Sequence, residues 1–216
     1  MKRVIGLGAG GHAKVVIEIL RLTGGYRLVG LLDSNPERRG ATVSGIEILG
    51  DDRLLPELYQ SGVRSAFIGL GTVKETAPRR RLYETVRQHG FEMARALHPQ
   101  AVISSSAEIG DGPTVMAGAI INAEARLGDN VIVNTGAIIE HDCLVGSHVH
   151  IATGARLAGA VQIEDGAHIG LGASVRQGLH IGRNVVVGAG AVVIDDVPDD
   201  VTVVGVPARI LKRVGS

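Results

Sequence analysis

The sequence predicts two domains: a Rossmann-like α/β domain with a parallel sheet over residues 1–98, followed by a parallel β-helix over residues 99–216. Three observations predict this organisation. A glycine-rich loop follows the first apolar run, aliphatic residues recur every six positions in the second half, and all five aromatic residues precede residue 98. A narrow β-helix has little room for aromatic rings, so their distribution agrees with the repeat.

Apolar strands and helices alternate along the first domain, which is typical of a small parallel sheet. We expect a glycine loop at residues 8–11, between a buried strand and a helix. The expected strands are 4–7, 28–32, 66–70 and 91–97, and the expected helices are 12–22, 52–60 and a third from near Pro78 to before Gly90.

The glycine loop is a candidate site for an anionic ligand. Gly8, Gly10 and Gly11 let backbone N–H groups approach a phosphate at a helix N-terminus, where the helix dipole also favours negative charge. Two alternatives stay open. One is a dinucleotide, because Gly6, Gly8 and Gly11 match G-x-G-x-x-G, and the other is a tight turn with no ligand.

Two polar residues near this loop favour a nucleotide diphosphate, and a third can contact a nucleoside. His12 and Lys14 follow the loop directly and bring positive or polar groups to it. Asp33 comes about twenty residues later at the end of the second expected strand, where it can accept hydrogen bonds from a ribose or a base.

Residues 103–193 carry a strict period of six. Every sixth residue from Ile103 to Val193 is Ile, Leu or Val, and the residue four places after each is small or apolar. This period fits neither an α-helix nor an isolated strand, but it fits a coil with three flat sides and inward-pointing aliphatic residues. Glycine often follows the aliphatic residue, as at Gly128 and Gly146, and we expect it to relieve corners where φ is positive.

Composition argues against several classes of partner. Lys plus Arg and Asp plus Glu both number 22, so the whole chain shows no footprint for nucleic acid or a membrane surface. The single cysteine, Cys143, excludes an internal disulfide and fits a reducing compartment. No apolar run is long enough to cross a bilayer, and the N-terminus does not resemble a signal peptide, so we expect a cytoplasmic protein.

Among the five histidines of the repeat, His141 is the candidate for chemistry. It stands between Glu140 and Asp142, which can orient and polarise the imidazole. A histidine that titrates near neutrality can take the proton of an attacking amine in acyl transfer. Two alternatives remain: a solvated surface histidine, and a metal site, because His150 and His168 are 18 residues apart and should stack on successive coils.

Three segments resemble motifs of one protein family, in the same order along the chain. They are residues 10–16 (GGHAKVV), residues 134–146 (NTGAIIEHDCLVG) and residues 205–209 (GVPAR). They are similar to the glycine loop, the active-site segment and the C-terminal signature of bacterial nucleotide-sugar acetyltransferases. This group belongs to the hexapeptide-repeat acyltransferases and includes sialic acid O-acetyltransferases and bacillosamine N-acetyltransferases.

The resemblance implies a left-handed β-helix and a homotrimer with each active site between subunits. It implies acetyl-CoA as co-substrate, a nucleotide-linked amino sugar as acceptor, and no metal. His141 is then the general base, oriented by Asp142 in preference to Glu140, although family members often carry Glu at position 142. Cys143 occupies an inward-facing position of the repeat and is expected to be buried rather than nucleophilic.

The resemblance also assigns the remaining site residues. Gly8 and the loop at Gly10 to Lys14 are expected to hold the nucleotide diphosphate, and Asp33 the nucleoside. The other expected contacts are Asn134 on the amino sugar, His150 and the Gly159 N–H on the acetyl thioester, and Gly205 and Pro207 near CoA.

Four functional hypotheses follow. The first is direct acetyl transfer to the amino group of a 4-amino-4,6-dideoxy sugar nucleotide. The second is an O-acetyltransferase that uses the same base on a hydroxyl group. The third is a β-helical zinc hydratase, and the fourth is a nucleotide-sensing or scaffold protein that uses the β-helix only to trimerise. The sequence does not distinguish GDP from UDP.

Overall fold

The computed structural model of the protein describes residues 1–71 and 76–213. The described chain divides into two compact units, one formed by residues 1–71 and 78–99 and the other by residues 76–77 and 100–213. None of the helices in these ranges is both long enough and apolar enough to span a membrane.

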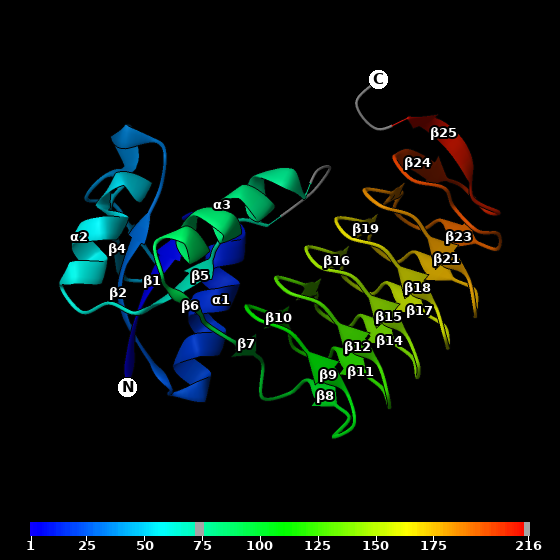
Figure 1. Cartoon of the computed structure of the whole chain (residues 1–216), viewed down its shortest axis with the longest axis horizontal. Coiled ribbons are helices and arrows are strands. Elements are labelled where there is room, and N and C mark those ends of the chain that lie inside the picture. The colour runs from blue at the N-terminus through cyan, green and yellow to red at the C-terminus, as the bar shows by residue number, and fades with distance from the viewer. Residues whose placement is uncertain (72–75, 214–216) are drawn as a thin grey trace. The chain divides into compact units, whose positions relative to one another are not determined.

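A six-stranded sheet with the order β3-β4-β2-β1-β5-β6 forms the centre of the first unit (Figure 1). All of its neighbouring strands are parallel except the β3–β4 hairpin. The strands are β1 (Lys2–Leu7), β2 (Tyr26–Leu32), β3 (Thr42–Val43), β4 (Ile46–Gly50), β5 (Ser65–Ile68) and β6 (Glu92–Met93), and β7 (Ala96–Leu97) follows. The helices are α1 (Gly11–Thr23), α2 (Leu55–Gln60) and α3 (Ala77–Gln88), with 3₁₀ turns η1 (Pro36–Arg38) and η2 (Asp52–Leu54).

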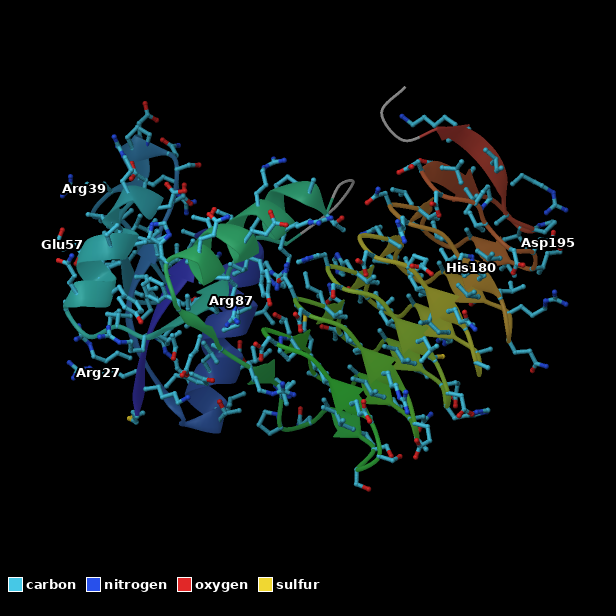
Figure 2. The ribbon with its side chains drawn as sticks, in the orientation of Figure 1. Arg27, Arg39, Glu57, Arg87, His180 and Asp195 are labelled. Carbon is cyan, nitrogen blue, oxygen red and sulfur yellow. The ribbon has the colours of Figure 1, made fainter. Side chains whose placement is uncertain are left out.

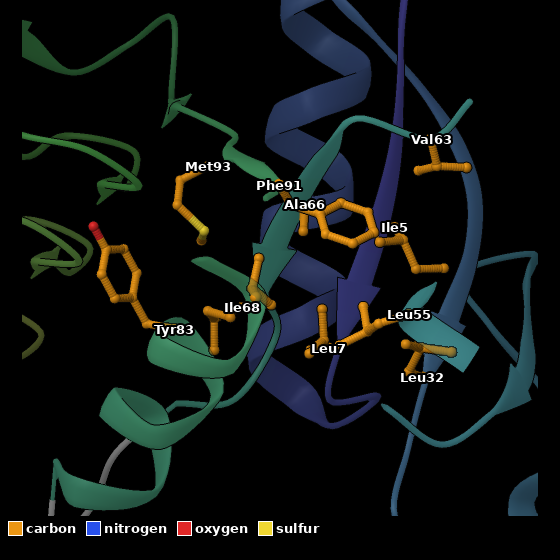
Figure 3. Close-up of a cluster of buried hydrophobic side chains, with 11 residues drawn as sticks. Ile5, Leu7, Leu32, Leu55, Val63, Ala66, Ile68, Tyr83, Phe91 and Met93 are labelled. Carbon is orange, nitrogen blue, oxygen red and sulfur yellow. The ribbon is translucent and has the colours of Figure 1, made fainter. Parts of the chain in front are cut away.

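The order in which strands are added to the sheet reverses at β1, because β2 lies on one side of β1 and β5 on the other. In open parallel sheets, ligands bind at such a switch point, outside the carboxyl ends of the strands. The core beneath this edge is apolar, with Ile5, Leu55 and Phe91 almost fully buried (Figure 3). The rings of Tyr59 and Phe91 meet edge to face with centroids 5.2 Å apart.

The predicted elements of the first unit are present with three differences. The hairpin β3–β4 was not expected, the helix predicted over 52–60 begins as the 3₁₀ turn η2, and the strand predicted over 91–97 is two short strands. The hairpin turns through Ser44 and Gly45, which both have positive φ, at 50° and 75°. Two consecutive left-handed residues suit a tight turn between antiparallel strands.

The second unit is a left-handed β-helix of sixteen two-residue strands, from β8 (Val102–Ile103) to β23 (Val192–Val193), one beginning every six residues. The strands stack as three parallel sheets: sheet 1 contains β10, β13, β16, β19, β22 and β24, sheet 2 contains β8, β11, β14, β17, β20 and β23, and sheet 3 contains β9, β12, β15, β18 and β21. Residues 18 apart are in register, as Ile121 is with Ile139. The strands β24 (Val201–Val204) and β25 (Arg209–Arg213) close the C-terminal end as an antiparallel pair.

Each strand from β8 to β23 ends at a predicted aliphatic position, so the repeat prediction is confirmed. The expectation for the glycines is wrong in one respect. Positive φ occurs at the third residue after the aliphatic residue, as at Gly136 and Asp142, and not at Gly128 or Gly146. A Cβ on Gly128 would lie 2.6 Å from Ser147 Oγ, so this glycine is needed for the close approach of the next coil.

Charged side chains connect successive coils at the surface of the β-helix. His180 Nε2 lies 3.2 Å from Glu164 Oε1, and Asp195 Oδ2 lies 3.6 Å from Arg209 Nη1 (Figure 2). Pairs as exposed as these contribute little to stability.

Candidate active site

His141 and Asp142 form a pair at the corner between sheets 2 and 3, directly after β14 (Ile138–Ile139). His141 Nδ1 lies 2.7 Å from Asp142 Oδ2, and the two side chains are 63% and 60% exposed. Asp142 has a φ of 60°, a left-handed conformation that Asp adopts more readily than most residues. The imidazole is therefore oriented by a carboxylate while its Nε2 edge stays available to a substrate.

The other flanking carboxylate has a different partner. Glu140 Oε2 accepts a hydrogen bond of 2.8 Å from Asn122 Nδ2 on the neighbouring coil. Of the two carboxylates considered from the sequence, only Asp142 has a hydrogen bond to the imidazole among the contacts of the described residues.

The imidazole of His141 lies over Gly159, one coil further along. A Cβ at position 159 would lie 2.7 Å from His141 Cε1 and 2.8 Å from Nε2, so only glycine leaves space for the ring. The backbone N–H of Gly159 donates to no described residue, whereas the next amide, Ala160 N–H, donates to His141 O at 2.9 Å. A free N–H beside the imidazole is suited to stabilise a developing oxyanion.

Cys143 follows this pair but faces the inside of the β-helix. Its side chain is buried and its Sγ donates to Ala158 O at 3.2 Å. Burial raises the pKa of the Cys143 thiol, so the sulfur stays protonated near neutral pH.

Asn134 directly follows the sheet 1 strand β13 (Ile132–Val133) and lies beside His150, which neighbours His168 on sheet 1. Asn134 Nδ2 donates to His150 Nε2 at 3.2 Å, and the rings of His150 and His168 meet edge to face with centroids 4.9 Å apart. Burial lowers the pKa of His168 below its usual value. Within residues 1–71 and 76–213, no three His, Cys, Asp or Glu side chains are close enough together to hold a metal ion.

The structure separates the predicted residues of the β-helix into two groups. His141, Asp142 and Gly159 share the corner between sheets 2 and 3, whereas His150 belongs to sheet 1 and Asn134 directly follows a strand of that sheet. In a coil with three sides, the corner between sheets 2 and 3 lies opposite sheet 1. His141 and His150 therefore lie on different parts of the coil.

Gly205 and Pro207 lie in the loop between β24 and β25. Val192 N–H donates to Gly205 O at 3.0 Å, and Ala208 N–H donates to Val192 O at 2.8 Å. These bonds attach the loop to β23, the last strand of sheet 2.

A cavity of about 310 Å³ lies at the carboxyl ends of β1 and β2 in the first unit. Gly8 lines it with a φ of 92°, and a Cβ there would lie 3.0 Å from the backbone nitrogen of Leu70. Gly10 lines it too, and a Cβ at Gly10 or Gly11 would meet no atom within 4 Å, so the start of α1 is open. This volume is in the range of small-molecule sites.

Asp33 holds the glycine loop in place. Its Oδ2 accepts from Ala9 N at 3.2 Å and from Arg38 Nη1 at 2.7 Å, and its Oδ1 accepts from Asn35 N at 3.0 Å. Arg38 Nη2 in turn donates to Ala9 O at 2.8 Å. Sequence reasoning missed Arg38, because nothing in the order of residues signals that it returns from η1 to the loop after β1.

His12 lies beside a buried arginine, and Lys14 is exposed. Arg79 Nη1 donates to Ile68 O and Leu70 O at 2.8 and 2.9 Å and lies 3.4 Å from His12 Nε2. Burial lowers the pKa of Arg79 to about 9. This arginine was not predicted, and it fixes the end of β5 next to His12.

Comparisons with known proteins agree with both units. The family described as the PglD N-terminal domain matches residues 3–86, the bacterial transferase hexapeptide matches residues 124–159, and the hexapeptide repeat of succinyl-transferase matches residues 160–194. UDP-N-acetylbacillosamine N-acetyltransferase of Bacillus subtilis (strain 168) is 39% identical over 118 residues, which are 54% of this chain and 52% of that protein. The match thus spans about half the length of this curated relative.

Two solved structures are similar over nearly the whole chain. PerB from Caulobacter crescentus, in complex with CoA and GDP-perosamine, is 41% identical, with a TM-score of 0.90 and 97% of each chain covered. The acetyltransferase domain of PglB from Neisseria gonorrhoeae FA1090, in complex with acetyl coenzyme A, is 38% identical, with 97% of this chain and 99% of that chain covered and a TM-score of 0.87.

The β-helix and the two hexapeptide matches define a hexapeptide-repeat acyltransferase. The N-terminal unit and these relatives narrow this class to one family. The chain belongs to the family of sugar N-acetyltransferases with a PglD-type N-terminal domain, which confirms the resemblance found in its three motifs.

Proposed function

We propose that the protein transfers the acetyl group of acetyl-CoA to the 4-amino group of a nucleotide-linked 4-amino-4,6-dideoxy sugar, with GDP-perosamine as the substrate. The observation that carries this proposal is the His141–Asp142 pair, 2.7 Å apart and stacked over a glycine. The 41% identity to a protein crystallised with CoA and GDP-perosamine supports the choice of acceptor.

His141 acts as the general base in this proposal. The uncharged amine attacks the thioester carbonyl, His141 Nε2 takes the proton that the amine loses, and the C–S bond breaks to release CoA thiolate. Asp142, bonded to Nδ1, holds the ring and stabilises the imidazolium that forms. The Gly159 N–H stabilises the tetrahedral oxyanion, and the neutral thiol of Cys143 takes no part.

Two chains form each site, and the protein is a trimer. The placement of His141 and His150 on different parts of the coil supports a site shared between chains, and the resemblance to trimeric hexapeptide-repeat acyltransferases supports the trimer. His150 and Asn134 of one subunit contact the thioester and the sugar, while a neighbouring subunit contributes His141. The loop at Gly205 and Pro207 lies along the CoA, and no metal takes part.

The glycine loop holds the nucleotide. Gly8, Gly10 and Gly11 bring the open N-terminus of α1 to the diphosphate, with His12 and Lys14 beside it. Asp33 keeps one face towards the nucleoside while its hydrogen bonds to Ala9 and Arg38 fix the loop.

Substrate profiling tests this function. Thiol release from acetyl-CoA is measured with GDP- and UDP-linked 4-amino-6-deoxy sugars and with the matching 4-hydroxy sugars, and the products are identified by mass spectrometry. We expect turnover with the GDP-linked amino sugar and an amide product. Acetyl esters from the hydroxy sugars with no amide product would show an O-acetyltransferase instead.

A further inference from the structure

The polar side chains that line the cavity at the glycine loop are not equally available to a ligand. Four of its lining residues carry polar side chains: Asp33, Ser34, Arg38 and Asp52. Asp33 and Arg38 bond to each other and to the backbone of Ala9, so they form the frame of the cavity. Asp52 is exposed, and its side chain has no hydrogen bond or ion pair with any described residue.

The neighbouring carboxylate is not available in the same way. Asp51 Oδ2 lies 2.5 Å from Arg53 Nη2, and Asp51 Oδ1 accepts the backbone N–H of Arg53 at 3.1 Å. Arg53 is therefore directed to Asp51, and Asp52 keeps both oxygens for a ligand in the cavity.

The position of Asp52 in the sheet indicates which part of the ligand it meets. It begins η2 directly after β4, and β4 is separated by β2 from β1, whose end carries the glycine loop. Two strand spacings are about 10 Å, which is comparable with the span from the phosphates to the far edge of the base of a nucleotide. A carboxylate repels phosphate, so its favourable partner is a donor edge of the base.

We propose that Asp52 recognises the Watson–Crick edge of guanine and makes the cavity selective for GDP-linked sugars. Guanine presents N1–H and the exocyclic N2 amino group side by side, and these match the two oxygens of a carboxylate. Uracil presents one N–H between two carbonyl oxygens. A carboxylate repels these oxygens, because both groups are acceptors. The apolar walls from Leu7, Leu32 and Leu70 contact the faces of the base. This inference rests on the proposed function for the identity of the ligand as a nucleotide.

Nucleotide binding by the full chain tests the proposal, with GDP, IDP and UDP as probes in calorimetry. IDP lacks only the N2 amino group of guanine. The wild type is expected to bind GDP more tightly than IDP and UDP, by about 10- to 100-fold. In Asp52→Asn, the affinity for GDP falls to that for IDP, while the affinity for UDP is unchanged or higher. Asp51→Asn is the matched control and keeps the wild-type order.

Equal affinities of the wild type for GDP and IDP would overturn the proposal, as would an Asp52→Asn variant that weakens all three nucleotides by the same factor. Thermal melting of each variant verifies its fold. Because binding is measured without acetyl-CoA, the result is independent of catalysis. GDP-selective binding without acetyl transfer contradicts the proposed function only, whereas acetyl transfer to a UDP-linked sugar with no preference for GDP contradicts this inference only.

Discussion

The two units place their functional groups by different means. In the β-helix, His141 and Gly159 are positioned by the repeat itself, because residues 18 apart lie on successive coils. In the first unit, Asp33 and Arg38 are positioned by hydrogen bonds between segments that follow different strands. A substitution in the β-helix is therefore expected to act on one neighbour, whereas one at Asp33 acts on a whole loop.

Among the substitutions that keep His141 itself, the largest effect is expected from Gly159→Ala, which places a methyl group where the His141 ring lies. Displacement of the base lowers kcat by about 100-fold in an acetyl-transfer assay. The control is the same change in a His141→Ala background, where thermal stability should fall much less than in the wild type. An equal loss of stability in both backgrounds would show that the ring is not what excludes a side chain.

Asp142→Ala and Glu140→Ala form a matched pair for the orientation of the base. Only Asp142 bonds to His141 Nδ1, since Glu140 bonds to Asn122. We expect kcat to fall by about 10- to 100-fold for Asp142→Ala and to change little for Glu140→Ala. Steady-state kinetics with saturating acetyl-CoA measures both, and the reverse order would assign the role to Glu140.

Asp33→Ala tests whether the first unit responds as a connected frame. Loss of three hydrogen bonds releases the Ala9 N–H and Arg38 Nη1, so the glycine loop is fixed less firmly. Affinity for GDP and UDP should fall together, by about 10-fold, with a loss of about 1–3 kcal/mol in the free energy of unfolding. Calorimetry and chemical denaturation check these values. A selective loss of GDP binding would instead place Asp33 on the base.

His168 gives the smallest expected effect, a pH dependence of stability. Burial lowers the pKa of His168 below the usual 6.5. As the pH falls through this value, His168 binds a proton in the unfolded chain but stays neutral in the folded chain. Stability is therefore lost on acidification, and His168→Gln should reduce this loss. Melting temperatures from about pH 7.5 to about pH 5 measure the slope. The exposed His89→Gln is the control and should leave it unchanged.

Sequence reasoning succeeded where a pattern determines the structure. The repeat specified the place of each strand from β8 to β23, because one strand and one corner occupy each six residues. The repeat did not specify which corner residue is left-handed, because glycine occurs in it for two different reasons. At Gly136 the backbone has a positive φ, whereas at Gly128 the next coil approaches too closely for a side chain. The backbone angles and the contacts between coils separate these two causes.

The first unit was less predictable because its contacts join residues that no local pattern relates. The hairpin β3–β4 is short, and its Ser44-Gly45 turn was the one signal for it. Arg38 and Arg79 reach backbone carbonyls after β1 and β5, and neither partner can be read from neighbouring residues. Motifs identified the loop, but not the side chains that hold it.

The most direct test of the account is turnover by His141→Asn compared with the wild type, with binding of the GDP-linked amino sugar measured on the same samples. We expect kcat to fall by about 10²- to 10⁴-fold while the affinity for the sugar nucleotide is retained, because His141 moves a proton and the first unit holds the nucleotide. A variant that keeps wild-type turnover would contradict the assignment of His141 as the general base.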